Sequence, residues 1–498
     1  MIRASSIPLI NRALTTQERI AIIDRRGVHS YGDVINQSIE IAQHLLRDTA
    51  DLAEARVAFM TSPGIDYVAA QWGIWLAGGI AVPLCLSHPL LEIEYVINNA
   101  GIKFIVAHPE FEEKLSPLIE AYNLILIHSN PEDNIPEVPL PEIEVNRNAM
   151  ILFTSGTTCK PKGVVTTHKN ISAQITSLVK SWEIVEDDRI LHALPLHHIH
   201  GIINALYCPL WAGARCEMMT RFNADAIWER FVKSDLTLFM AVPTIYVKLI
   251  ASWERAGRVE KETMSSACSK MRLMISGSAA LPVNILEKWK SICGHTLLER
   301  YGMTEIGMAL SNPLHGERKP GYVGTPLPGV ELQLVDDNGE IITEEMKEGE
   351  IQVKGDNVFQ EYWDNAQSTR DAFHRGWFRT GDIAVIKNGF YRILGRSSID
   401  IIKSAGYKIS ALEIEEVLRS HPEIDECAVV GINDEKWGER ICAAIVTRDN
   451  CVLTLDNLRQ WARERIAKYK IPSRLKIVPH LPQNVMAKVT KPEVKKLF

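Results

Sequence analysis

The 498-residue sequence lacks any Cys-x-x-Cys pair, any internal repeat and any low-complexity tract. Its nine cysteines are scattered and odd in number, which argues against a disulfide framework and against a cysteine-rich zinc module. The N-terminal stretch has too short an apolar run for a secretory signal peptide. We therefore expect free thiols in a reducing, cytoplasmic compartment.

The sequence also has no excess of basic residues over acidic ones. The formal net charge is −6, which argues against a general nucleic-acid-binding protein. The charge is unevenly distributed: residues 396–498 carry 18 Lys and Arg against 14 Asp and Glu, a net +4, and residues 1–395 carry a net −10. A basic C-terminal module on an acidic body indicates an anionic ligand between the two.

Long uninterrupted apolar runs are scarce. The longest, residues 67–86, would be long enough to span a bilayer if length were the only criterion. Gly78-Gly79 and Pro83 interrupt it, and this pattern predicts a buried helix, a turn and a strand instead. We therefore expect no membrane span.

Strand-like and helix-like segments alternate up to about residue 395. Amphipathic stretches such as 31–48 precede short β-rich runs such as 56–60, and this alternation favours α/β layers with a largely parallel sheet. Residues 330–395 change to short alternating strands with Asn-Gly turns, which is typical of a small β-subdomain. The predicted fold class is α/β, with a large domain over 1–395 and a small α+β domain over 396–498.

The stretch ILFTSGTTCKPKGVV, residues 151–165, has the composition of a phosphate-binding loop. Small residues let backbone N–H groups face a ligand, hydroxyls add donors, and Lys160 and Lys162 add positive charge. It is not a Walker A loop, because no Gly-Lys-Ser/Thr precedes a helix. From composition alone, a solvated Ser/Thr turn is an equal alternative.

Seven ordered motifs favour the phosphate loop. They are TSGTTCKPKGVV (154–165), LPLHHIHG (194–201), MISGSAALP (274–282), ERYGMTE (299–305), WFRTGD (377–382), GRSSIDIIKSAGYKIS (395–410) and LPQNVMAKVTK (481–491). Together they resemble the adenylate-forming superfamily of acyl-CoA synthetases, adenylation domains and luciferases. The resemblance implies a large N-terminal domain of several subdomains that binds ATP and an acid. It also implies a small mobile C-terminal domain and a hinge near 396–400, at Ser398.

The resemblance further implies a two-step reaction that uses ATP, Mg²⁺ and coenzyme A. A carboxylate attacks the α-phosphate of ATP to give an acyl-adenylate and pyrophosphate, and a thiol then displaces AMP. The residues implied in catalysis are Lys488, Glu305, Thr304 and His198, and Glu305 is also the implied metal ligand. By the same resemblance, His198 stands where a ring guards the path of the acyl group and moves as the thiol enters. The residues implied in binding the ATP phosphates are Thr154, Ser155, Gly156, Thr157, Thr158 and Lys162.

The adenosine, acid and thiol sites are implied in the same way. The adenosine site comprises Gly277, Ser278, Ala279, Glu299, Arg300, Tyr301, Gly302, Asp382 and Arg396. The acid pocket comprises His198, Val242, Thr244, Arg272, Met303, Gly307 and Met308. The coenzyme A surface comprises Ser404, Ala405, Gly406 and Lys408.

The acid is expected to be short. The motifs resemble most closely those of malonyl-CoA synthetases, which indicates malonate or methylmalonate, with Arg272 as the candidate cation for the second carboxylate. Three alternatives stay open: a ligase for another short- or medium-chain acid, an enzyme that loads a separate carrier protein, and a degenerate nucleotide-binding relative. The last stays open because Cys159, Ala405 and Ala487 stand where relatives have glycine.

His197, His198 and His200 raise the question of a metal ion. Adjacent histidines reach one ion only in special loops, and no cysteine or acidic residue lies nearby in the sequence. We therefore expect no metal at these histidines. His197 is expected to line the acyl pocket or to face water.

Overall fold

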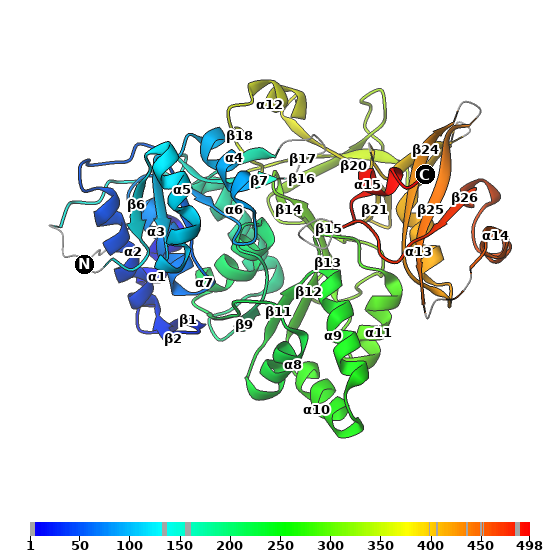
Figure 1. Ribbon diagram of the computed structural model, residues 1–498, viewed down its shortest axis with the longest axis horizontal. Helices are drawn as coiled ribbons and strands as arrows, with labels where there is room; N and C mark the ends of the chain where they lie inside the picture. Colours follow the sequence, from blue (N-terminus) through cyan, green and yellow to red (C-terminus); the bar gives the residue numbers. More distant parts are fainter. Residues whose placement is uncertain are drawn as a thin grey trace.

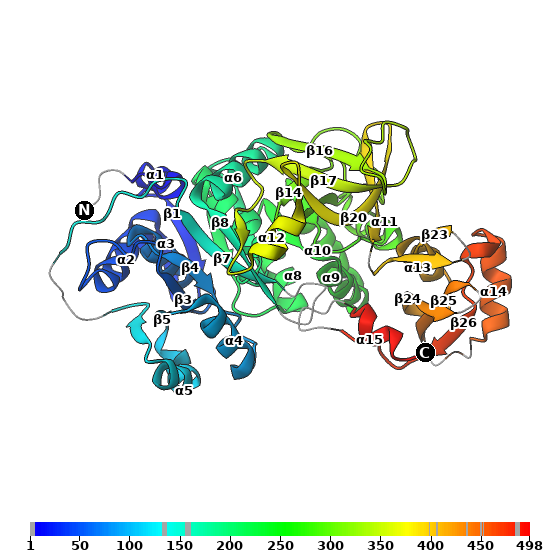
Figure 2. The same ribbon diagram turned by 90° about the horizontal axis from the view of Figure 1, so that it is seen from above.

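The computed structural model describes residues 5–131, 137–154, 161–397, 399–404, 407–434, 437–448, 451, 453–483 and 489–498. Figures 1 and 2 show an elongated molecule: three sheets form the N-terminal part, and a fourth lies at the far end with the C-terminus. The predicted α/β class, with parallel-rich sheets in a large N-terminal part and a small α+β part, is confirmed. Among the described helices, none is long and apolar enough to cross a membrane.

The first sheet has seven strands in the order β18-β8-β7-β4-β3-β5-β6, of which β4, β3, β5 and β6 are parallel neighbours. The apolar run 67–86 is divided as predicted, because α3 ends at Leu76 and β4 begins at Ile80. Between them Gly78 has φ 80°, a conformation that favours glycine. The strands are β3 (Arg56–Met60), β4 (Ile80–Pro83), β5 (Phe104–Ala107), β6 (Ile125–His128), β7 (Asn148–Thr154), β8 (Lys162–Thr167) and β18 (Glu361–Tyr362). The helices are α2 (Tyr31–Leu45), α3 (Ile65–Leu76), α4 (Leu90–Ala100), α5 (Glu112–Tyr122) and the 3₁₀ turn η1 (Pro109–Phe111).

The second sheet has nine strands in the order β15-β14-β13-β12-β11-β9-β10-β1-β2. Strands β13, β12, β11, β9 and β10 are parallel neighbours, so their carboxyl ends share one edge. The strands are β1 (Ile20–Asp24), β2 (Gly27–Ser30), β9 (Arg189–His192), β10 (Arg215–Met218), β11 (Leu238–Ala241), β12 (Leu273–Ser276), β13 (Leu298–Met303), β14 (Gly307–Ser311) and β15 (Thr325–Pro326). The helices are α1 (Pro8–Leu14), α6 (His168–Trp182), the π-helix η2 (His200–Tyr207), α7 (Cys208–Ala212), α8 (Ala224–Lys233), α9 (Pro243–Arg255), α10 (Arg258–Ser269) and α11 (Val283–Cys293).

The third sheet is antiparallel and covers the predicted β-subdomain. Its turn at Asn388-Gly389, with φ 51° and 77°, joins β20 to β21 as the Asn-Gly pair predicts. The strands are β16 (Val330–Val335), β17 (Gly349–Gly355), β19 (Phe373–His374), β20 (Trp377–Lys387) and β21 (Phe390–Arg396), with α12 (Ala366–Ala372) between β18 and β19.

The fourth sheet forms the C-terminal part. The chain changes sheet between Arg396, the last residue of β21, and Ile401, the first residue of β22. The strands are β22 (Ile401–Ser404), β23 (Tyr407–Ser410), β24 (Ile424–Asp434), β25 (Gly438–Thr447) and β26 (Arg474–Ile477). The helices are α13 (Ala411–Arg419), α14 (Leu455–Arg463), the 3₁₀ turn η4 (Lys468–Lys470) and α15 (Lys491–Lys495).

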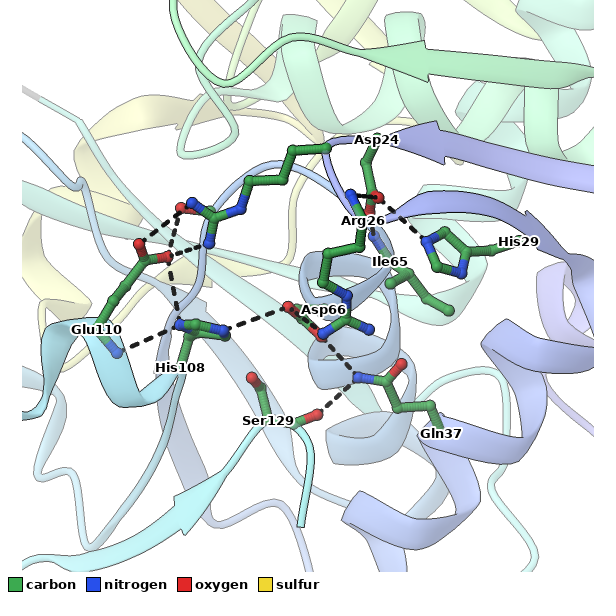
Figure 3. Close-up of polar contacts among 11 residues, drawn as sticks. Asp24, Arg26, His29, Gln37, Ile65, Asp66, His108, Glu110 and Ser129 are labelled. Atoms are coloured by element: carbon green, nitrogen blue, oxygen red, sulfur yellow. Dashed lines mark hydrogen bonds and ion pairs between the residues drawn. The ribbon is translucent and has the colours of Figure 1, made fainter. Parts of the chain in front are cut away.

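A buried polar network joins the β1–β2 hairpin of the second sheet to α3 of the first (Figure 3). Asp66 on α3 is 5% exposed and accepts hydrogen bonds from Arg26 Nη1 at 2.9 Å and from Gln37 Nε2 at 2.7 Å. Asp24, at the end of β1, accepts from the N–H of Ile65 at 2.9 Å. These contacts fix how the first two sheets meet.

Candidate active site

Four segments that carry predicted acid and adenosine residues meet at the carboxyl edge of the second sheet. The histidine motif follows β9, Val242–Thr244 follows β11, Gly277–Ala279 follows β12, and Met303 ends β13 with Thr304 and Glu305 after it. Because these four strands are consecutive parallel neighbours, their loops lie side by side. Loops at the carboxyl ends of parallel strands are the usual ligand-binding place in α/β sheets.

The predicted phosphate loop connects two antiparallel strands of the first sheet. Thr154 ends β7 and Lys162 begins β8, and the two residues stand opposite each other in register. Residues 155–160 between them, including the predicted Ser155, Gly156, Thr157 and Thr158, lie outside the described residues. Lys162 Nζ lies 4.9 Å from the ring centroid of Tyr362, a cation–π contact with β18.

Glu305, the predicted metal ligand, is buried and contacts Tyr362, the same tyrosine that Lys162 contacts. Its side chain accepts a hydrogen bond from Tyr362 Oη at 3.0 Å and the residue is 7% exposed. Burial raises the pKa of Glu305, although the hydrogen bonds and the charge of Arg396 partly oppose it. A buried carboxylate with so little compensation fits a hard cation such as Mg²⁺, which prefers carboxylate and phosphate oxygens.

Asp382, predicted to bind the ribose, lies in a hydrogen-bonded cluster of three side chains. Tyr301 Oη donates to Asp382 Oδ2 at 2.6 Å, and Arg396 Nε lies 3.1 Å from Asp382 Oδ1. Burial raises the pKa of Asp382 despite the neighbouring guanidinium. Asp382 and Arg396 are cross-strand partners in β20 and β21, so the third sheet presents both to the edge where β13 ends.

The glycines of the adenosine motifs allow very close packing. A Cβ at Gly277 would lie 2.5 Å from the guanidinium of Arg300, and a Cβ at Gly302 would lie 2.0 Å from the carbonyl oxygen of Gly307. Ser278 has φ 70°, a left-handed backbone that is uncommon for residues other than glycine. Such strain persists where surrounding structure holds it and is frequent at functional sites.

Arg300 is a buried cation with no acidic partner among the described residues. It is 4% exposed, and its only described side-chain contact is Nη2 to Ser278 Oγ at 3.4 Å. Its Nε has no hydrogen-bond partner there. Burial lowers the pKa of Arg300 to about 9. His200 Nδ1 lies 3.1 Å from the same Ser278 Oγ, so a cation, a hydroxyl and an imidazole converge.

The structure contradicts the prediction that Arg272 lines the acid pocket. It precedes β12, at the amino end of a four-residue strand whose carboxyl end carries Ser278, and such a strand spans about 13 Å. Its guanidinium is committed to Asp188, with Nη2–Oδ2 at 2.6 Å and Nε–Oδ1 at 3.1 Å. It also donates to the carbonyl of Trp182 at 3.0 Å. The guanidinium of Arg272 is therefore occupied in joining three segments of the chain, away from the acid pocket.

Comparisons with known proteins now identify the family. A family model described as AMP-binding enzyme matches residues 9–363, and one described as AMP-binding enzyme C-terminal domain matches residues 413–488. The chain belongs to the AMP-binding enzyme family. It is 45% identical to the mitochondrial malonate–CoA ligase ACSF3 of Mus musculus, over 99% of this chain and 90% of that protein.

Two further relatives of this AMP-binding enzyme come from plants and bacteria. A malonate–CoA ligase of Arabidopsis thaliana is 38% identical, over 98% of this chain and 87% of that protein. The crystal structure of ATP-bound MatB from Rhodopseudomonas palustris superposes with a TM-score of 0.90 at 30% identity, covering 99% of this chain and 98% of that one.

Several predicted residues of this AMP-binding enzyme stay predictions. Ser398, Ala405, Gly406 and Lys488 lie outside the described residues, and of Lys408 only the backbone is described. Ser404 ends β22 and pairs with Tyr407. Thr304, His198, Val242, Thr244, Met303, Gly307 and Met308 all lie in or beside loops at the edge described above.

Sequence reasoning missed two residues of this site and one contact. Tyr362 holds Glu305 but lies outside all seven motifs. Gln174 on α6 is buried against Gly307, although its sequence neighbours read as an ordinary amphipathic helix. His200 was noticed, but its contact with Ser278 joins residues 78 positions apart, and no sequence pattern predicts that contact.

Proposed function

We propose that this protein is an ATP-dependent, AMP-forming acid–CoA ligase whose acid is malonate or methylmalonate. The family match and the malonate–CoA ligases at 38–45% identity support the reaction class and the acid. The ATP-bound relative supports ATP as the nucleotide, and a further relative, solved with ATP and a magnesium ion, is 28% identical.

The reaction joins two anions, so the site must neutralise negative charge. Lys162 supplies one ammonium beside the loop that is predicted to hold the triphosphate. Mg²⁺ bound through Glu305 would shield the phosphate oxygens. Asp382, oriented by Tyr301 and Arg396, supplies acceptor oxygens for the ribose hydroxyls.

The buried guanidinium of Arg300 is the observation that best supports a dicarboxylic acid as the substrate. A monocarboxylic acid would leave this charge buried and uncompensated after its one carboxylate has turned to the phosphate. A dicarboxylic acid would place its second carboxylate against Arg300 and Ser278, because a buried charge requires a partner of opposite sign. Arg300, rather than Arg272, would therefore be the cation that binds the second carboxylate.

The remaining predicted residues would act in the second half-reaction, in which the thiol displaces AMP. Ser404, Ala405, Gly406 and Lys408 would border the path of coenzyme A, and the cap formed by residues 401–498 would rotate about the segment between Arg396 and Ile401. Lys488 would face the acid and the α-phosphate in one orientation of this cap. The relative from Mus musculus is named as mitochondrial, and the compartment of this chain stays a prediction.

The experiment measures ATP–pyrophosphate exchange with malonate and with propionate, in the protein and in Arg300→Gln. We expect exchange with malonate to exceed exchange with propionate. In Arg300→Gln, kcat/KM for malonate should fall about 100-fold, the effect of removing one member of a buried charge pair, while propionate changes little. Arg272→Gln is the matched control, because it removes an arginine of the same sheet away from the site.

Equal loss with both acids in Arg300→Gln, in a variant that still melts cooperatively, would contradict the role of Arg300 in selecting a dicarboxylate. If Arg300→Gln does not fold, Arg300→Lys keeps the charge and tests its geometry. Release of AMP with free coenzyme A supports the ligase, and release only with a holo-carrier protein would contradict it.

A further inference from the structure

Three side chains that are far apart in the sequence converge beside the histidine motif. One ligand atom each of Cys85, His88 and His197 lies within 4.8 Å of the others. Cys85 and His88 stand on the loop after β4 in the first sheet, and His197 stands on the loop after β9 in the second. The cluster therefore bridges two sheets. Cys85 and His88 lie over 100 positions from His197 in the sequence, so the spacing around the histidine motif could not indicate them.

The chemistry of the three side chains is that of a metal centre. Cys85 is 5% exposed, and its Sγ lies 3.2 Å from Ser87 Oγ on the same loop. Cysteine binds metals as its thiolate, and imidazole binds them through a ring nitrogen, so all three side chains are of metal-ligating type. One thiolate and two imidazoles suit zinc and similar borderline or soft cations, and exclude Mg²⁺.

The surroundings hold these ligands in place. Glu92 Oε2 lies 3.3 Å from His88 Nδ1, and a carboxylate beside a ligand histidine is the usual partner that fixes its orientation. Lys114 Nζ donates to the carbonyls of Leu86 and His88, each at 2.9 Å, and so fixes the loop that carries Cys85. Ligands around one tetrahedral zinc are about 3.3–3.8 Å apart, so small side-chain rotations would close the cluster on an ion.

The cluster also touches the predicted acyl path. The ring centroids of His197 and His198 are 4.0 Å apart, and His198 is the residue implied to move as the thiol enters. On the other side, the ring centroids of His88 and His197 are 5.8 Å apart. An ion held by His197 would therefore fix the loop on which His198 must move.

We propose that Cys85, His88 and His197 form a binding site for Zn²⁺, with a fourth position open to water, and that its occupation slows the enzyme by immobilising the loop of His198. The proposal that Zn²⁺ binds, its binding half, depends only on the arrangement of these three side chains. The inhibitory half rests on the proposed ligase function, and the two halves are tested separately.

Binding is tested with Co²⁺ as a spectroscopic probe on the full-length protein. We expect one Co²⁺ per chain, a thiolate-to-cobalt charge-transfer band in the near ultraviolet, and displacement by Zn²⁺. Cys85→Ser and His197→Phe should each abolish the band and weaken binding at least about 100-fold, and Glu92→Gln should weaken it about tenfold. Cys451→Ser is the matched control, because it removes a thiol of the C-terminal part and should leave the band intact.

A charge-transfer band that survives Cys85→Ser, or the absence of Co²⁺ binding to the unmodified chain, would overturn the site. Inhibition is then measured as thioester formation at buffered free Zn²⁺ with constant Mg²⁺ and ATP, so that chelation is equal in all variants. We expect a severalfold loss of kcat in the unmodified protein and in Cys451→Ser, and none in His88→Gln. Equal inhibition in His88→Gln would overturn the inhibitory half and leave the binding result standing.

Discussion

Gly307 is the most tightly packed backbone position of the candidate site. It has φ 60°, and a Cβ there would lie 1.1 Å from Gln174 Oε1. We expect Gly307→Ala to lower the free energy of unfolding by about 3 kcal/mol or more and to abolish pyrophosphate exchange, because overpacking adds to the backbone cost. Gly316→Ala is the control, since Gly316 has φ 100° but faces open space, so its cost should be about 1 kcal/mol. Equal losses in both variants would show that packing against Gln174 is unimportant.

Glu299 gives the site a pH dependence of stability. Burial raises the pKa of Glu299 from 4.5 to about 8, with the N–H of Gly321 partly opposing the shift. Because the folded chain holds this proton more tightly than the unfolded chain, the contribution of Glu299 to stability declines as the pH rises from about 4.5 to about 8. We expect Glu299→Gln to flatten the decline of the melting temperature between pH 5 and pH 8. The exposed Glu331→Gln serves as the control, and an unchanged slope in Glu299→Gln would contradict the shift.

At the scale of elements, the polar network of Figure 3 replaces apolar packing where the hairpin meets the first sheet. Removing Arg26 leaves the buried Asp66 without the guanidinium whose Nη1 lies 2.9 Å away. We expect Arg26→Ala to cost about 2–3 kcal/mol of stability, measured as a shift of the melting temperature, because one partner of a buried pair is lost. Arg258→Ala, which removes an exposed pair with Glu262 within one helix, should cost less than about 0.5 kcal/mol. Similar costs would mean that the network contributes little.

At the scale of the whole molecule, few polar contacts join the described residues of the cap, residues 401–498, to the N-terminal part. Arg392 on β21 lies 3.4 Å from Glu416 on α13, and Ser410 donates to the carbonyl of Leu394. Lys491 on α15 lies 2.6 Å from Asp400 and 2.9 Å from Glu415, and so ties the C-terminal helix to the connecting segment and to α13 rather than to the N-terminal part.

We therefore expect the cap orientation to respond to a single charge. Arg392→Glu should change the population of the present orientation about two- to fivefold, measured by distance-dependent fluorescence between body and cap, because a partly exposed ion pair is worth up to about 1 kcal/mol. The double variant Arg392→Glu with Glu416→Arg should restore the original distribution. The charge reversal Arg465→Glu, just after α14, is the control, and an equal response to it would show that net charge alone is responsible.

The sequence by itself determined the family, the α/β class and the ordered motifs, because short-range spacing and hydrophobic periodicity are local properties of the chain. It also predicted that residues 67–86 are core rather than membrane span, because glycine and proline act locally. Only the tertiary structure decided which arginine is free for a substrate. Arg272 and Arg300 both lie in or beside short strands of the second sheet, but Arg272 meets Asp188 from a distant segment and Arg300 meets no acid among the described residues. The same holds for Cys85 and His197, since contacts between two sheets depend on how the chain folds back and not on neighbours in sequence.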